Sequence, residues 1–173
     1  NMLHAWSNGD SWSSITYTNS GYGAGTITSS NGNFIFDSSN DNKVYVWSHV
    51  TYGWSDITYT NGGYGVGTII SSEGNFAFDA SNDNKVYAWN AATGTWAGAD
   101  YNNGGYGAGT IISSNGNFAF DDSGNNRVYA WSSATGTWSS INYTNGGYGA
   151  GTITASNGNF IFDSSNDNTV YVF

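Results

Sequence analysis

The acidic side chains that could do chemistry in this chain recur at alternate positions of one short segment. These positions are Asp37, Asp41, Asp79, Asp83, Asp163 and Asp167. Oxygen ligands at alternate positions are typical of the start of a calcium-binding loop. The bidentate glutamate that closes a helix–loop–helix site is missing, because position 48 is a serine. A hairpin turn, whose Asp and Asn side chains bond to their own backbone, explains the segment without an ion. We predict this turn and no metal or cofactor, with calcium as the alternative.

Three further sets of side chains could contact a ligand. They are Tyr22, Tyr64, Tyr106 and Tyr148, then Asn19, Asn61, Asn103 and Asn145, and finally Trp47, Trp89 and Trp131. Aromatic faces pack against the C–H patches of sugars, and amide side chains bond to hydroxyl groups. A second row, Trp54, Trp96 and Trp138, is predicted to lie in the core.

Catalytic side chains are scarce. The two histidines, His4 and His49, are not equivalent within the pattern described below, and there is no cysteine. No Gly-x-Ser-x-Gly segment marks a nucleophilic serine. The carboxylates recur regularly, which favours a structural role over one specialised acid. We predict that the protein is not an enzyme.

Charge excludes one class of partner. The chain has 173 residues, with 3 basic and 12 acidic side chains and a net charge of −9. Nucleic-acid binding requires Lys and Arg to neutralise phosphates, so we expect no nucleic-acid partner. No apolar run reaches the ~20 residues that a membrane-spanning helix needs, so we expect no membrane insertion.

The side chains above are positioned by a repeat. Trp12, Trp54, Trp96 and Trp138 are each 42 residues apart. Within a unit, segments such as GNFIFD and KVYVW alternate in character and are rich in β-branched and aromatic residues, which is typical of strands. Asn-Gly pairs between them, as in SNGN at 30–33, predict two-residue hairpins of type I′. Each unit therefore reads as four strands without a helix.

A family resemblance follows from these segments. NKVYAWNAATGTWAG (84–98) and NRVYAWSSATGTWSS (126–140) resemble the third and fourth strands of a kelch repeat, and GYGAGTIISSNGNFAFD resembles the first two. Kelch repeats carry a glycine pair after the second strand, where this chain has Asp79-Ala80. The resemblance implies an all-β propeller. It also implies that the glycines of GYGAG line the innermost strand of each blade.

We therefore predict a β-propeller with four four-stranded blades, and a single domain over 1–173. The strand pair 2–18 precedes repeats at about 20–60, 62–102, 104–144 and 146–173, and the N-terminal strand is expected to complete the last repeat. The chain then has one more copy of the unit's third strand than four blades need, and this extra strand lies near residues 2–6.

Two functions fit these features. The first is a multivalent, lectin-like protein that binds glycans without catalysis, by analogy with lectin-like propellers. The second is a structural protein, such as a fibre or matrix subunit or a designed idealised propeller, that assembles by strand exchange through residues 2–6 and 169–173. A protein-interaction platform of the kelch kind is a third. We expect an extracellular or cell-surface location.

Overall fold

The computed structural model describes the chain except for residues 10, 19–23, 25, 61–64, 103–106, 145–148 and 165–166. The described residues form five antiparallel sheets. The first sheet holds β1 (Met2–Ser7) and β2 (Ser11–Thr16). The second holds β3 (Ile27–Ser30), β4 (Asn33–Ser38), β5 (Lys43–Ser48) and β6 (Gly53–Thr58). The third holds β7 (Ile70–Ser72), β8 (Asn75–Ala80), β9 (Lys85–Asn90) and β10 (Thr95–Asp100).

The remaining two sheets continue the pattern. The fourth holds β11 (Ile112–Ser114), β12 (Asn117–Asp122), β13 (Arg127–Ser132) and β14 (Thr137–Asn142), and the fifth holds β15 (Thr154–Ser156), β16 (Asn159–Ser164) and β17 (Thr169–Val172). Two single-turn 3₁₀ helices, η1 (Ser81–Asp83) and η2 (Ser123–Asn125), lie between second and third strands. The all-β class and the four-stranded unit are thus confirmed, in the meander order of a propeller blade.

The hairpin turns follow the expected chemistry. Asn31 and Gly32 both have positive φ, at 44° and 80°, as a type I′ turn requires. The pairs Glu73-Gly74, Asn115-Gly116 and Asn157-Gly158 repeat this geometry. Each turn joins the first and second strands of a unit, so it fixes their register.

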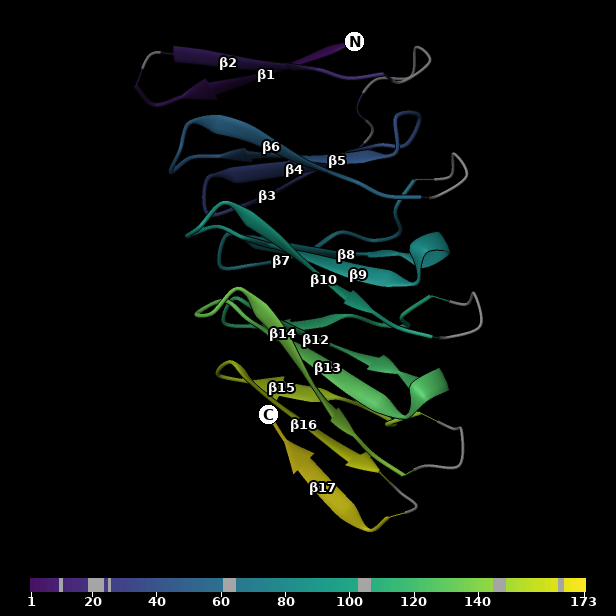
Figure 1. Cartoon of the computed structure of the whole chain (residues 1–173). Coiled ribbons are helices and arrows are strands. Elements are labelled where there is room, and N and C mark those ends of the chain that lie inside the picture. Colours follow the sequence, from purple (N-terminus) through teal and green to yellow (C-terminus); the bar gives the residue numbers. More distant parts are fainter. Residues whose placement is uncertain are drawn as a thin grey trace.

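The sheets follow one another in a row (Figure 1). The β1–β2 sheet and the β15–β17 sheet lie at opposite ends of this row, and the row does not close on itself within the chain. In the described residues β2 pairs with β1, and the last sheet has three strands. The expected completion of the last repeat by the N-terminal strand therefore does not occur here. The physical reason is that the β1–β2 sheet packs on its neighbour in sequence, through Leu3 and Ile15.

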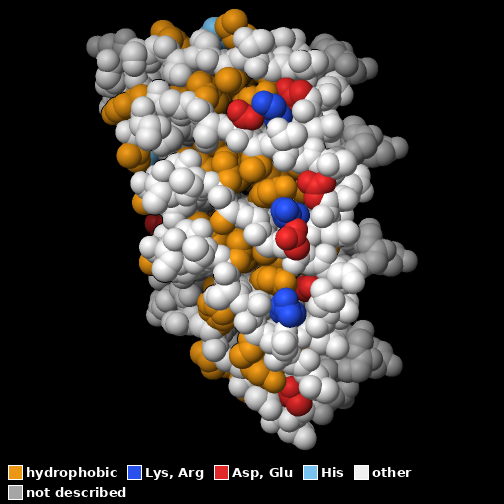
Figure 2. Space-filling view, viewed as in Figure 1, with side chains coloured by type: hydrophobic (Ala, Val, Ile, Leu, Met, Phe, Trp, Pro, Cys, Tyr) orange, Lys and Arg blue, Asp and Glu red, His pale blue; other side chains and the backbone are white. Residues whose placement is uncertain are grey.

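Each sheet has two unlike faces, because strand side chains alternate. One face is aliphatic and packs on the next sheet, as Ile35, Val44 and Val46 do. The other is aromatic and packs on the preceding sheet, as Phe76 and Trp89 do. The same pairing recurs in the next interface, between the third and fourth sheets. Figure 2 shows hydrophobic side chains between successive sheets.

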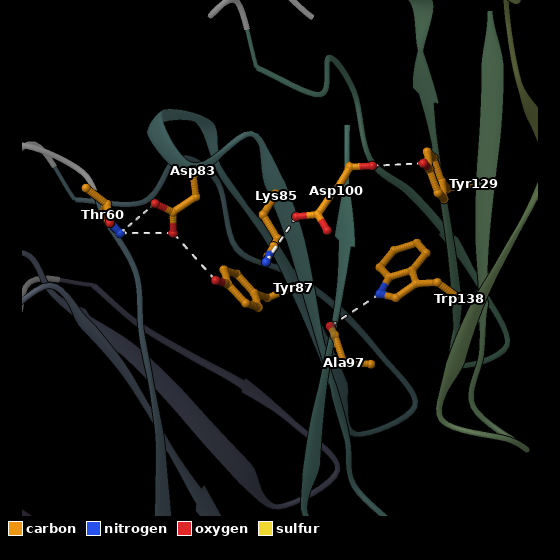
Figure 3. Close-up of polar contacts among 8 residues, drawn as sticks. All are labelled: Thr60, Asp83, Lys85, Tyr87, Ala97, Asp100, Tyr129 and Trp138. Carbon is orange, nitrogen blue, oxygen red and sulfur yellow. Dashed lines mark hydrogen bonds and ion pairs between the residues drawn. The ribbon is translucent and has the colours of Figure 1, made fainter. Parts of the chain in front are cut away.

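Polar contacts also join neighbouring sheets (Figure 3). Tyr129 Oη donates to the Asp100 carbonyl at 2.8 Å, and Trp138 Nε1 donates to the Ala97 carbonyl at 3.2 Å. The Thr60 amide donates to both carboxylate oxygens of Asp83, at 3.0 and 2.9 Å. These bonds fix how one sheet is rotated relative to the next.

A buried asparagine repeats the linkage at the other edge of the row. Asn75 accepts a bond from the Ala91 amide at 2.8 Å and donates to the Gly116 carbonyl of the next sheet at 3.1 Å. In return, the Gly116 amide donates to Ser72 Oγ at 2.9 Å. Asn33 and Asn117 make the equivalent bonds. One amide side chain thus satisfies buried backbone groups of two sheets.

Charged side chains line one face of the row, visible as blue and red groups in Figure 2. Lys43 pairs with Asp56 at 2.8 Å and Lys85 pairs with Asp100 at 3.0 Å. Both lysines therefore contact acids of the fourth strand rather than acids of the turn between the second and third strands. Arg127 Nε instead donates to Asn142 Oδ1 at 2.8 Å. Such exposed pairs are worth about 0–1 kcal/mol.

Candidate functional site

The glycine-rich connection between units is anchored by one carboxylate. Asp79 accepts a bond from Tyr101 Oη at 2.6 Å through Oδ1 and a bond from the Ala108 amide at 2.9 Å through Oδ2. Tyr101 and Ala108 lie on either side of segment 103–106. A single side chain therefore ties together both ends of the connection that leads to the next sheet. We call this arrangement the carboxylate clamp.

Two further copies of the carboxylate clamp have nearly the same geometry. Asp37 binds Tyr59 Oη at 2.5 Å and the Val66 amide at 2.9 Å. Asp121 binds Tyr143 Oη at 2.6 Å and the Ala150 amide at 2.8 Å. Repetition at the same unit positions indicates a role in building every unit.

Burial shifts the ionisation of these groups. It raises the pKa of the Asp37 and Asp121 carboxyls, and the bonds from tyrosine and backbone only partly oppose it. Burial, followed by the bond to a carboxylate, also raises the pKa of Tyr101 and Tyr143. The tyrosines are thus held as neutral donors.

The glycines beside the clamp have a conformational reason. Gly107 has a φ of 82°, and a Cβ at this position would lie 2.7 Å from Asp79 Oδ2. This corrects the expectation that the GYGAG glycines line the innermost strand. The first strands begin only after them, at Ile70, Ile112 and Thr154, since the positive φ of Gly107 does not fit a strand.

Two equivalent clefts open beside the clamps, one unit apart. The first has a volume of about 340 Å³, and the second about 380 Å³. The first is lined by Gly67, Thr68, Ile70, Asp79, Gly109, Thr110 and Ile111. The second is lined by Ala108, Gly109, Thr110, Ile112, Asp121, Ser123, Gly151, Thr152 and Ile153. Carboxylate, threonine hydroxyl and isoleucine thus face the same small space in both.

The clefts can accept hydroxyl groups. An ionised carboxylate offers about four acceptor sites, and the two bonds of the Asp79 clamp leave capacity for others. Thr110 is exposed at the rim of both clefts, and a threonine hydroxyl both donates and accepts. The isoleucines supply an apolar wall. This donor and acceptor set suits a small neutral ligand rather than an anion, because no Lys or Arg lines either cleft among the described residues.

The sequence did not point to these cleft residues as a site. A threonine follows the glycine phrase in all four units, at Thr26, Thr68, Thr110 and Thr152. This regularity is the signal in the sequence that could have indicated the cleft. The same segment, taken alone, predicts strand structure.

The expected ligand-binding tryptophans lie elsewhere. Trp47, Trp89 and Trp131 are 3%, 0% and 1% exposed. The preceding sheet covers Trp89 and Trp131, whereas Trp47 packs against Phe34 and Tyr52 of its own unit. Their prediction as exposed ligand contacts is corrected on this ground. Trp54, Trp96 and Trp138, predicted as core, do pack against the core clusters, although they are only partly buried.

The other expected ligand residues cannot be placed. Tyr22, Tyr64, Tyr106, Tyr148, Asn19, Asn61, Asn103 and Asn145 all lie outside the described residues. Their roles remain predictions from the sequence.

Five of the six acids proposed for calcium, all except Asp163, make hydrogen bonds to other described parts of the protein. Asp41 binds Tyr45 Oη at 2.9 Å and the Thr18 amide at 3.2 Å. Asp167 binds Tyr171 Oη and the Thr144 amide in the same way. Asp163 is exposed. Over the described part of the chain, no group of three or more His, Asp or Glu side chains is placed to hold a metal ion.

The histidines are separate from the clefts. His4 Nδ1 lies 2.7 Å from Ser14 Oγ on the β1–β2 sheet. His49 Nδ1 lies 2.9 Å from Asn33 Oδ1. In the described segments, no helix is long and apolar enough to cross a membrane.

Comparisons with known proteins give distant likenesses. No family model and no curated protein matches the chain. Virginiamycin B lyase from Staphylococcus aureus is 17% identical, with a TM-score of 0.48 over 100% of this chain and 62% of its own. A streptogramin B lyase structure is also 17% identical, with a TM-score of 0.48 over 100% of this chain and 61% of its own. The computationally designed Ika8 protein is 14% identical, with a TM-score of 0.45 over 85% of this chain and 44% of its own.

The chain therefore spans less than two thirds of the length of these structures. Membership of the kelch family remains a prediction from the sequence.

Proposed function

We propose that the chain is a non-catalytic, multivalent binding protein whose repeated clefts take neutral polyhydroxylated ligands, namely glycans. The observation that carries this proposal is the recurrence of one cleft chemistry at a spacing of one unit, with Thr110 shared by two clefts. Volumes of about 340 and 380 Å³ lie at the lower end of the ~300–1,000 Å³ of small-ligand sites.

The binding chemistry is hydrogen bonding to hydroxyl groups. Asp79 and Asp121 accept, the threonine hydroxyls accept or donate, and the isoleucines contact the C–H faces of a sugar ring. The clefts have no aromatic lining among the described residues, so each single site binds weakly. Several weak sites that engage one glycosylated surface gain apparent affinity, because the later contacts are intramolecular.

A glycan array tests this proposal. The protein is compared with a triple variant, Thr68→Val, Thr110→Val and Thr152→Val, which removes three exposed hydroxyls while nearly preserving shape. We expect loss of glycan binding in the triple variant. Thr58→Val, an exposed change in β6, is the matched control and should bind as the wild type does. Absence of any glycan ligand, or binding unchanged by the triple variant, contradicts the proposal.

A further inference from the structure

Inside the row, the second strands of neighbouring sheets meet through one repeated pair of residues. Phe76 packs against the aliphatic face that carries Ile35, and both are 0% exposed. Phe118 packs in the same way against the face that carries Ala77. An aromatic residue at this position of β8, β12 or β16 is therefore matched to the aliphatic residue of the preceding sheet.

At the two ends of the row, one member of this pair is left over. Ile161 on β16 is 42% exposed, and Phe34 on β4 is 36% exposed. A depression of about 340 Å³ lies beside Ile161 and includes Phe160 and Val172. A second, of about 350 Å³, lies beside Phe34 and includes Trp6 and Trp47. The two surfaces are the two halves of the interface that is closed inside the row.

The polar groups of that interface are also left over at the ends. Inside the row, Asn33 Nδ2 donates to the Gly74 carbonyl at 3.1 Å, and the Gly74 backbone amide donates to Ser30 Oγ at 2.9 Å. The equivalent groups at the ends are Asn159, Ser156 and Gly32, and all three are exposed. Asn159 Nδ2 reaches only carbonyls of its own turn, at 3.3 and 3.5 Å.

We propose that copies of this chain associate head to tail, with β15–β16 of one copy seated on the Phe34 side of β3–β4 of the next. Ile161 then covers Phe34. Asn159 donates to the Gly32 carbonyl, and the Gly32 amide donates to Ser156. The occupant is a second copy because the new contact continues, residue for residue, the interfaces already present within the row.

The proposed contact does not overlap the surface that the β1–β2 sheet already covers. The β1–β2 sheet covers the other half of the same aromatic face, through Leu3 and Ile15 against Phe36 and Trp54. Two strands then compete for the position beside β16, namely β17 of the same copy and β1 of the next copy. β17 gives way, since it has four residues against six and its two valines are exposed. The strand exchange expected from the sequence thereby acquires a definite geometry.

Such a contact is heterologous, because it joins two different surfaces. It therefore extends the row or closes a ring of several copies. It does not depend on the glycan proposal, because the cleft threonines take no part in it.

The test is a complementation experiment followed by light scattering and sedimentation. The wild-type chain should show a mass that rises with concentration above 18.4 kDa. Ile161→Asp blocks one surface and Phe34→Asp blocks the other, and each variant alone should be monomeric. Mixed in equal amounts, they should form a species of twice the monomer mass and nothing larger. A carboxylate at a buried apolar contact should weaken association by about tenfold or more.

Two controls separate this geometry from others. Ala92→Asp, at an exposed turn position of the third sheet, which carries neither surface, should associate as the wild type does, and circular dichroism should show that every variant is folded. Hydrogen exchange should show faster exchange of β17 amides in the associated state. A wild type that stays monomeric at every concentration, self-association of either Asp variant alone, or a mixture without a dimer would each overturn the proposal.

Discussion

Tyr101 donates its hydroxyl to Asp79 at 2.6 Å from across the glycine-rich connection that separates two sheets. The partner groups are 22 residues apart in sequence, yet they belong to the same unit. The clamp therefore forms within a unit and positions the start of the next one. The contribution of the clamp to the free energy of unfolding can be measured against Tyr87, whose bond to Asp83 is much longer, at 3.5 Å.

Tyr101→Phe should lower the free energy of unfolding by about 1–3 kcal/mol, because a part-buried carboxylate loses a donor. Urea unfolding measures this change. Tyr87→Phe is the matched control, since Tyr87 Oη lies 3.5 Å from Asp83 and the bond is weak at that length. The control should cost clearly less. Equal costs for the two variants would show that the clamp adds no stability.

The clamp tyrosines should also make stability sensitive to alkali. In the unfolded chain a tyrosine loses its proton near pH 10, whereas burial and the bond to Asp79 raise the pKa of Tyr101 in the folded chain. The folded state therefore keeps a proton that the unfolded state releases. The stability contribution is complete below pH 10 and falls as the pH rises above it. Tyr101→Phe should make this fall shallower between pH 9 and about pH 11, as measured by urea unfolding at each pH.

The carboxyl side of the clamp can be followed by NMR. Burial raises the pKa of Asp121 above 3.8 in the folded chain, so the folded state takes up this proton at a higher pH than the unfolded state does. Its contribution to the free energy of unfolding rises as the pH falls through this window. Tyr143→Phe should shift the titration midpoint of Asp121 further upward, because the bond from Tyr143 lowers it. A downward shift would contradict this account.

Alanine substitutions at two neighbouring glycines distinguish backbone strain from a steric clash with Asp79. Gly107 and Gly109 both have positive φ, at 82° and 71°, so alanine at either costs roughly 1–2 kcal/mol in backbone strain. Only at Gly107 would the new Cβ meet Asp79 Oδ2, at 2.7 Å, while a Cβ at Gly109 would have no such neighbour within 4 Å. Gly107→Ala should therefore lower the melting temperature clearly more than Gly109→Ala. Equal effects would rule out the carboxylate as the obstacle.

The asparagine linkage allows a similar comparison. Asn75→Ala leaves the Ala91 amide and the Gly116 carbonyl without their partner, which should cost about 2–4 kcal/mol if each lost bond costs 1–2. Asn159 occupies the equivalent position on the exposed end sheet. Asn159→Ala should leave the stability of the monomer within about 0.5 kcal/mol and should weaken the head-to-tail association. A large loss of monomer stability would show that Asn159 is already engaged within one copy.

Local patterns were sufficient to predict the strands and hairpins. Alternation in GNFIFD and the Asn-Gly pair at 31–32 act over a few residues, and the structure has the strand and the turn that they indicate. The exposure of Trp89 could not be predicted in this way. Its burial depends on which face of β9 meets the preceding sheet, and that is set by how sheets stack.

The role of Asp79 as a clamp could not be predicted from the sequence for a related reason. Its spacing to Asp83 resembles that of metal ligands, but its partners lie 22 and 29 residues away. The cleft threonines belong to the same class, because they acquire a common environment only when two units are placed side by side.

The unlike faces of each sheet give the row a direction, and this has a consequence for its length. Every internal boundary joins the same two surface types, so removing or adding one whole 42-residue unit would leave the chemistry of every boundary unchanged. Stability should then change by a near-constant increment for each unit, in the manner of a one-dimensional chain of coupled neighbours. The number of units is free to vary without redesign of any single contact.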